Sequence, residues 1–233
     1  MTIEQQTQTP APSTPAWAML RTLGGIAMLS GLLVVLVYQF TLPIIAENQR
    51  RMTEKAVFHV LDGAVAKRDF VLTAEDALVP AGEGAEGVHL YAGYDAAGAL
   101  VGIAFPGAAR GYQDVIQFLF GYDPACQCVI GSKVLKSTET PGLGDKISTD
   151  AEYLKNFEAL DARLDAAGTA LANPIVPVKH GTKTQPWQID AISGATITSN
   201  AMARAVNDAA QRVAPAVQRE LALFSEPNRS EGR

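Results

Sequence analysis

The first fifty residues contain an apolar segment without a charged side chain. No residue between Arg21 and Glu47 is charged, and the run is rich in leucine, isoleucine, valine and methionine. About 20 apolar residues suffice to cross the hydrocarbon core of a membrane, so this run can span it with some tilt. Trp17 and Tyr38 suit the two membrane–water interfaces. The pattern predicts a transmembrane helix over residues 17–46.

A cleaved signal peptide is the alternative for such a segment. The apolar region is too long for a signal peptide, and no clear small-residue cleavage site follows it, because residues 43–46 lead straight into the polar stretch 47–51. A buried helix of a soluble protein would need apolar packing on all sides. We therefore expect a membrane anchor that stays on the protein.

Beyond the anchor, the pattern predicts one domain over residues 47–224. Residues 44–61 have an apolar stripe at helical spacing, which predicts a helix that continues out of the membrane. Short β-like runs separated by turn residues follow, and they predict an antiparallel meander. These runs are 88–94, 99–106, 115–122 and 126–135.

The rest of the domain mixes helices with strands. Residues 150–160 and 200–213 have helical patterns, whereas 175–178 and 187–189 are typical of short strands. The predicted fold class is therefore α+β, an antiparallel sheet with helices packed on it. The polar tails, 1–16 and 225–233, lack the apolar content to pack, and we expect them to be disordered.

Residues 190–199, Asp-Ala-Ile-Ser-Gly-Ala-Thr-Ile-Thr-Ser, stand directly before the last predicted helix. Gly194 lets the backbone approach a bulky phosphate closely. The first N–H groups of a helix lack intrahelical partners, and the helix dipole favours an anion there. Thr198 and Ser199 are candidate N-caps. The segment predicts a phosphate-sized site, with a plain helix cap as the alternative.

A second motif, Glu-Thr-Pro-Gly-Leu-Gly-Asp-Lys-Ile, occupies residues 139–147. Two glycines and a proline so close together indicate an irregular loop. Such a loop can lay backbone amides against a flat ring, and Leu143 can supply an apolar face. Taken by itself, the motif also fits an ordinary turn.

Together the two motifs resemble the FMN-binding domain family, which includes the G subunit of the Rnf electron-transport complex and the C subunit of the sodium-pumping NADH:quinone reductase. Both motifs occur in the family's order. The sequence Gly-Tyr-Gln-Asp at 111–114 is similar to the family's start of a core strand. The resemblance covers residues 85 to 215 and the N-terminal anchor.

The resemblance implies a covalent FMN cofactor, carried by a phosphoester bond on Thr196. Ser193, Gly194 and Ala195 complete the attachment motif, and Asp190 resembles the residue by which a separate flavin transferase recognises its target. Capping a turn is the alternative role for Asp190. The loop expected to line the isoalloxazine contributes Glu139, Thr140, Gly142, Leu143 and Gly144.

The implied function is electron transfer within a membrane complex that couples ferredoxin and NAD redox chemistry to the movement of Na⁺ or H⁺. The implied partners are a multi-spanning flavin-bearing subunit, iron–sulfur subunits and the flavin transferase. No nucleophile–base pair is visible, so we expect no substrate chemistry by this chain alone. The alternatives are the C subunit of the quinone reductase, a non-redox structural module with an unmodified loop, and a signalling protein with an FMN sensor.

The resemblance also implies an inner-membrane protein whose domain is periplasmic. The basic residues point the other way, because Arg50, Arg51 and Lys55 follow the anchor and only Arg21 precedes it. The positive-inside rule alone would place the domain in the cytoplasm; we follow the resemblance. The formal net charge of −5 gives no basic footprint for nucleic acid.

Two cysteines, Cys126 and Cys128, are too few for a Cys₄ iron–sulfur or zinc site, and we expect no metal. Thiols are the favoured interpretation, with both side chains on one face of a strand. A local disulfide in an oxidising compartment is the alternative. Lys179 and His180 precede the attachment motif; an exposed pair is favoured over cations that stabilise reduced flavin.

Overall fold

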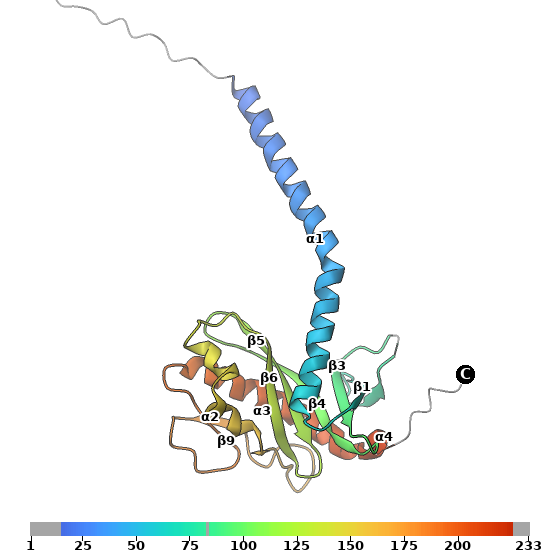
Figure 1. The fold of residues 1–233 in the computed structure, drawn as a ribbon. Coiled ribbons are helices and arrows are strands. Elements are labelled where there is room, and N and C mark those ends of the chain that lie inside the picture. The colour runs from blue at the N-terminus through green and yellow to red at the C-terminus, as the bar shows by residue number, and fades with distance from the viewer. Residues whose placement is uncertain (1–14, 83, 226–233) are drawn as a thin grey trace, which may run out of the picture. The chain divides into compact units, whose positions relative to one another are not determined.

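The computed structural model describes residues 15–82 and 84–225; most of each tail predicted to be disordered lies outside these ranges. The chain divides near Arg50 into two compact units, one with most of the first helix and one with the sheet. The elements, labelled in Figure 1, are α1 (Ala16–Val60), β1 (Ala66–Leu72), β2 (Leu78–Pro80), β3 (Val88–Tyr94), β4 (Leu100–Arg110), β5 (Val115–Asp123), β6 (Cys128–Lys136), the 3₁₀ helix η1 (Gly144–Ser148), α2 (Ala151–Leu154), the 3₁₀ helix η2 (Lys155–Phe157), β7 (Leu160–Asp161), β8 (Val176–Val178), β9 (Gln188–Asp190), α3 (Thr196–Arg219) and α4 (Leu221–Ser225).

The helix α1 joins the predicted transmembrane segment and the predicted helix 44–61 into one element. It is long and apolar enough to cross a membrane by length and composition. Pro43 lies inside it without ending it. Its last turns are different in character, because Ala56, Val57 and Val60 are buried against the sheet. Only the end of the predicted stripe, from Ala56 onward, therefore packs on the domain.

The large sheet has seven strands in the order β2-β1-β3-β4-β5-β6-β7, and every neighbouring pair is antiparallel. The predicted meander, strands β3 to β6, is confirmed. The sequence pattern missed β1 and β2. β1 begins with Ala-Lys-Arg-Asp, and only its last three residues are buried, so its apolar signal is too short to register.

The sheet separates two apolar clusters. On one face, Phe118 and Phe120 of β5 pack with α3, which lies across β4 and β5 (Figure 1). On the other face, Leu119 packs with the end of α1. Successive side chains of a strand point to opposite faces, so one strand supplies both clusters. The sheet is thus buried on both faces where it supports α3.

Two predicted helices have different bounds. Residues 150–160 do not form one helix, because α2 stops at Leu154 and only a 3₁₀ turn follows. There the side chain of Asn156 donates to the carbonyl oxygen of Tyr153, a local bond that competes with helix continuation. The last helix starts at Thr196 and continues through Pro215 to Arg219, since its buried face extends to Val217.

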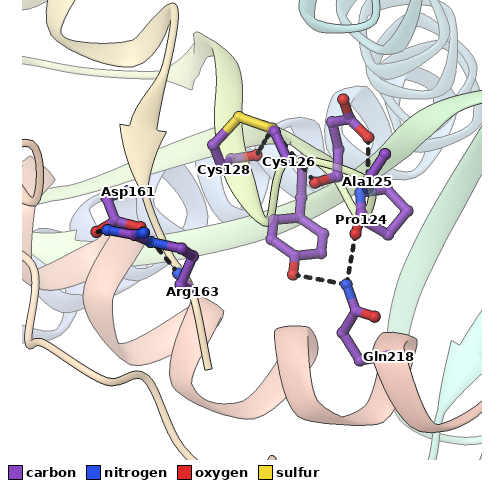
Figure 2. Close-up of a disulfide and its surroundings, with 9 residues drawn as sticks. Pro124, Ala125, Cys126, Cys128, Asp161, Arg163 and Gln218 are labelled. Atoms are coloured by element: carbon purple, nitrogen blue, oxygen red, sulfur yellow. Dashed lines mark hydrogen bonds and ion pairs between the residues drawn. A yellow bond between two sulfur atoms is a disulfide. The ribbon is translucent and has the colours of Figure 1, made fainter. Parts of the chain in front are cut away.

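The cysteines form a disulfide, so the favoured interpretation as thiols was wrong (Figure 2). Cys126 lies in the turn between β5 and β6, and only Cys128 belongs to a strand. The turn is also held from α3, where Gln218 donates to the carbonyl oxygen of Pro124 at 2.6 Å. The two side chains therefore close a turn instead of sharing a strand face.

Candidate functional site

The two sequence motifs meet at one cavity of about 530 Å³. It lies between the loop that follows β6 and the start of α3. Ten residues line it: Tyr112, Glu139, Thr140, Leu143, Gly144, Gly194, Ala195, Thr196, Ile197 and Thr198. We call it the motif cavity. Of the predicted site residues, Ser193 and Asp190 line a neighbouring cavity instead, and Gly142 lines neither of the two.

Thr196 is the first residue of α3, and no side chain caps this helix. The N-cap position is Ala195, which has no side-chain acceptor to offer. The N–H groups of the first turn are therefore left for an external acceptor, and the helix dipole makes an anion the favoured one. This arrangement suits a phosphoryl group on the Thr196 hydroxyl.

The prediction that Thr198 and Ser199 act as N-caps was wrong. Both residues lie inside the first turns of α3, and both hydroxyls are engaged elsewhere. The Thr198 hydroxyl donates to Oε2 of Glu139 at 2.6 Å. Ser199 Oγ accepts the N–H of Ile192 at 3.1 Å. Tertiary partners have replaced the local caps, which leaves the helix start open.

Gly194 takes the turn that brings the attachment motif onto the helix. Its φ is +84°, in the left-handed region that side chains rarely adopt. The following residue, Ala195, donates its N–H to the carbonyl oxygen of Ile192 at 3.1 Å, which closes the turn. The glycine thus provides the backbone conformation that this turn requires.

Glu139 is buried, with only 7% of its surface exposed. Its carboxylate accepts the Gln113 N–H at 3.0 Å through Oε1 and the Thr198 hydroxyl at 2.6 Å through Oε2. It therefore joins the β4–β5 turn, the loop after β6 and the first turn of α3. Gly144 lies so close that a Cβ there would approach Oε2 of Glu139 to 2.5 Å. The carboxylate therefore holds together the segments that form the wall of the motif cavity.

One wall of the motif cavity is apolar and open to solvent. Tyr112, Leu143 and Ile197 are 67%, 50% and 52% exposed, although each comes from a different part of the chain. Large apolar side chains gathered in one exposed patch mark a binding surface. They face the same space as Thr196, so a flat aromatic ring attached there has an apolar surface to cover.

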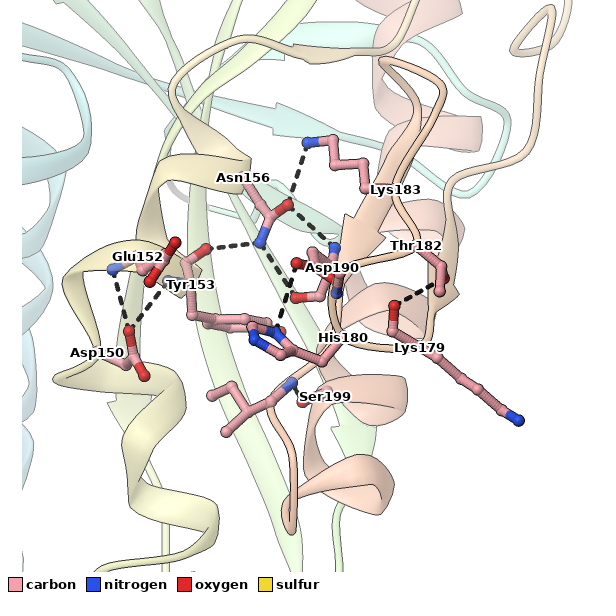
Figure 3. Close-up of polar contacts among 12 residues, drawn as sticks. Asp150, Glu152, Tyr153, Asn156, Lys179, His180, Thr182, Lys183, Asp190 and Ser199 are labelled. Atoms are coloured by element: carbon pink, nitrogen blue, oxygen red, sulfur yellow. Dashed lines mark hydrogen bonds and ion pairs between the residues drawn. The ribbon is translucent and has the colours of Figure 1, made fainter.

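Ser193 and Asp190 are among the residues that line a second, polar cavity of about 400 Å³. Figure 3 shows the polar contacts of Asp190. The segment 190–193 contributes to this cavity and 194–198 to the motif cavity. Oδ1 of Asp190 accepts the Gly181 N–H at 2.7 Å, and Oδ2 lies 3.4 Å from Nδ1 of His180. Lys183 lines the cavity too, and burial lowers its pKa while the charge of Asp190 opposes that shift.

Lys179 and His180 are both exposed, but they are not an unconnected pair, because His180 contacts Asp190. Neither lines the motif cavity. The interpretation of these two residues as cations beside the ring is therefore not supported by their position.

Comparisons with known proteins bear on the same residues. Residues 111–211 match the FMN-binding domain family, and this stretch contains both motifs. The G subunit of an ion-translocating oxidoreductase complex from Pseudomonas aeruginosa is 30% identical over 198 residues, which is 80% of this chain and 83% of the relative. The chain belongs to this family of G subunits.

Other members of the family align over less of their length. The Methanosarcina acetivorans protein is 36% identical over 126 residues, 54% of this chain and 58% of its own length. The G subunit of the Na(+)-translocating ferredoxin:NAD(+) oxidoreductase complex of Acetobacterium woodii is 36% identical over 101 residues, 43% of each chain. The chain thus spans only about half the length of several relatives that it matches.

The fold is shared with a solved structure, NqrC of Shewanella oneidensis. The TM-score is 0.54 at 19% identity, over 76% of this chain and 98% of NqrC. At such low identity the likeness concerns the fold alone. It agrees with the α+β prediction, in which an antiparallel sheet carries packed helices.

Sequence reasoning missed Ile197 and Thr198 as residues of the site and treated Tyr112 only as part of a strand signature. Ile197 was given no role in the sequence analysis, although it lies between Thr196 and Thr198. The sequence did contain a signal for an exposed apolar residue at the site. An isoleucine beside Thr196 has no apolar neighbour in the motif that would bury it. The sequence pattern gives no indication of the contact between Glu139 and Thr198, which are 59 residues apart.

Proposed function

We propose that this chain is the membrane-anchored electron-transfer flavoprotein of an Rnf-type ion-translocating complex, with FMN esterified to Thr196. One observation carries the proposal. The Thr196 hydroxyl belongs to the first residue of a helix without a side-chain cap, at the edge of a cavity with an exposed apolar wall. FMN consists of a phosphoryl group and a flat ring system. The uncapped helix start suits the phosphoryl group, and the exposed apolar wall suits the ring.

In this proposal the residues of the motif cavity have separate roles. The N–H groups of the first turn of α3 bind the phosphoryl oxygens. Tyr112, Leu143 and Ile197 cover the ring and exclude water from it, while Glu139 keeps the loop after β6 against α3. When bound, FMN accepts one or two electrons, which suits a relay between carriers of either kind.

Attachment forms a bond between Oγ1 of Thr196 and the FMN phosphorus and breaks the bond from that phosphorus to the leaving group of an activated flavin nucleotide. The leaving group departs as a nucleoside monophosphate when the donor is a flavin dinucleotide, and the threonine hydroxyl loses its proton. Among the described residues that line the motif cavity, Glu139 is the one carboxylate, and it already accepts from Thr198. This leaves no free base beside Thr196 in the cavity wall. A separate flavin transferase is therefore the proposed agent, with Asp190 as the residue that it recognises.

The proposal extends to the setting of the domain. Residues 17–46 anchor the chain in the inner membrane, and residues 47–224 form the FMN-binding domain on the periplasmic side. The partners are a multi-spanning flavin-bearing subunit and iron–sulfur subunits. The reaction of the complex is electron transfer between ferredoxin and NAD, coupled to Na⁺ or H⁺ movement, in line with the name of the Acetobacterium woodii relative.

The C subunit of a Na⁺-translocating quinone reductase is the second candidate, because the structural neighbour is an NqrC. It would use the same cavity and the same threonine. The relatives with the higher identities are G subunits of ion-translocating oxidoreductase complexes, and this favours the Rnf-type complex.

The attachment site is tested by mass spectrometry of the full chain purified from a membrane that also contains a flavin transferase. We expect the peptide with Thr196 to carry the mass of FMN less one water, and Thr196→Ala to abolish this mass while the fold is kept. Thr149→Ala is the matched control, since it makes the same change at an exposed threonine outside the motif cavity and should retain flavin. Flavin retained on Thr196→Ala, or absent from the unaltered chain, would overturn the assignment.

A further inference from the structure

Asp190 is the point where β9 ends and the attachment segment begins. β9 has only three residues, and β8 pairs with one of its edges. Two parallel strands of three residues each form few hydrogen bonds, so this pairing alone holds β9 weakly. The other edge of β9 faces the polar cavity, where the side chain of Asn156 approaches the backbone of Asp190 (Figure 3).

Asn156 is 6% exposed and uses both ends of its amide. Its Oδ1 accepts the N–H of Asp190 at 3.0 Å, and its Nδ2 donates to the carbonyl oxygen of Asp190 at 3.2 Å. The same Nδ2 donates to the carbonyl oxygen of Tyr153 at 2.9 Å, and Oδ1 accepts from Nζ of Lys183 at 3.0 Å. A primary amide offers two donors and two acceptor positions, so all of them are used.

This side chain therefore replaces a neighbouring strand for one residue. It satisfies both backbone groups of Asp190, as a paired strand would. The rest of the segment is held from α3, because Ser199 accepts the Ile192 N–H and Ala195 donates back to Ile192. Asn156 supplies the support at the Asp190 end of the segment.

We propose that Asn156 is a positioning residue for flavin attachment. It fixes the backbone of Asp190, so that the Asp190 carboxylate and the Thr196 hydroxyl are held in one arrangement for the flavin transferase. The carboxylate is 26% exposed and is fixed by Gly181 and His180, so it remains accessible from the polar cavity. The inference rests on the proposed function, because it concerns the loading of FMN on Thr196.

The test compares Asn156→Ala with Lys183→Gln in the full chain. Asn156→Ala leaves both backbone groups of Asp190 without their partner. Lys183→Gln is the matched control, because it removes a charged neighbour of Asn156 in the same cavity and leaves the two bonds to Asp190 intact. Asn156→Asp is a further variant of the same size that keeps the acceptor for the Asp190 N–H but turns an oxygen toward two carbonyl oxygens.

Two measurements are made on each variant. The first is the rate of covalent FMN loading by a flavin transferase, followed by intact mass at several transferase concentrations. The second is hydrogen exchange in the peptide that contains Asp190 and in a peptide from the middle of α3. Misplacement of reacting groups by about 1 Å can cost on the order of 100-fold in rate.

We expect both Asn156 variants to load about 10- to 100-fold more slowly at saturating transferase, with faster exchange near Asp190 and unchanged exchange in α3. Lys183→Gln should load at nearly the rate of the unaltered chain. Unchanged loading in both Asn156 variants would overturn the inference, and so would faster exchange throughout α3, which indicates a general loss of structure. If the unaltered chain takes no flavin, the proposed function itself falls, and the inference falls with it.

Discussion

At the scale of single residues, the carboxylate of Glu139 decides the shape of the motif cavity. It is buried and holds two donors from distant parts of the chain, Gln113 and Thr198. A buried donor that loses its acceptor costs about 1–3 kcal/mol in stability. The glutamate therefore matters to the site through the positions of other residues.

This gives a prediction for Glu139 and Thr198 together. Thr198→Val and Glu139→Ala should each lower the free energy of unfolding, and the double variant should lose less than the sum, with a coupling of about 1 kcal/mol or more. The measurement is denaturant unfolding of the full chain in detergent. Strictly additive losses would show that the 2.6 Å contact adds nothing to stability.

The structure brings most of the motif residues together, but the sequence pattern did not predict their contacts. Seven of the nine residues expected to hold FMN line one cavity. The amino-acid type at these positions follows from local backbone requirements that a sequence reveals, such as the turn at Gly194. Whether a hydroxyl caps its own helix or bonds a distant carboxylate depends on tertiary contacts, and this is why Thr198 and Ser199 were placed wrongly.

At the scale of elements, β6 separates the disulfide from the loop that contains Glu139. Cys128 is the first residue of this strand and Lys136 the last, and the loop with Glu139 follows. Nine residues of strand at about 3.3 Å each place the two ends roughly 25–30 Å apart. The disulfide lies too far from the motif cavity to share its chemistry.

We therefore predict that Cys126→Ser with Cys128→Ser leaves FMN loading and the reduction of the flavin unchanged. The stability loss should be small, at most about 1–2 kcal/mol, because the disulfide closes a loop of very few residues. Unfolding and flavin reduction of the double variant check this. A changed flavin reduction rate would show that the cysteine pair takes part in the redox chemistry.

The periodicity of the chain identified β3 to β6 and α3, which have long apolar patterns. The short strands predicted at 175–178 and 187–189 correspond to β8 and β9 within one residue, whereas β1 and β2 were missed. β1 has three buried positions, and the predicted helix 150–160 is interrupted where Asn156 turns its amide toward its own backbone and toward Asp190. A sequence pattern does not reveal which polar side chain will take over a backbone bond.

At the scale of the whole molecule, the last turns of α1 belong to the sheet domain. Ala56, Val57, Val60 and Leu61 form an apolar cluster with Ala104 and Leu119 of the sheet. A chain that begins at Glu47 keeps this cluster and loses the apolar segment, whereas one that begins at Asp62 loses both. The two truncations therefore separate anchoring from folding.

We predict that the chain from Glu47 is soluble without detergent and unfolds cooperatively. The chain from Asp62 should be less stable by about 5 kcal/mol, because two to three large side chains leave the core, and this approaches the whole stability of many domains. Fractionation and circular dichroism during denaturation check both. Equal stability of the two would mean that the end of α1 is dispensable to the domain.

The helix α3 begins at Thr196, and one face of this helix is buried along most of its length. An FMN attached there has the rigidity of the core, so it cannot swing on a flexible arm as a lipoyl group does. To approach a donor and then an acceptor, the flavin must be carried by the entire domain. Electron exchange by a flavin at Thr196 would then depend on the position of the whole domain and not on a mobile arm.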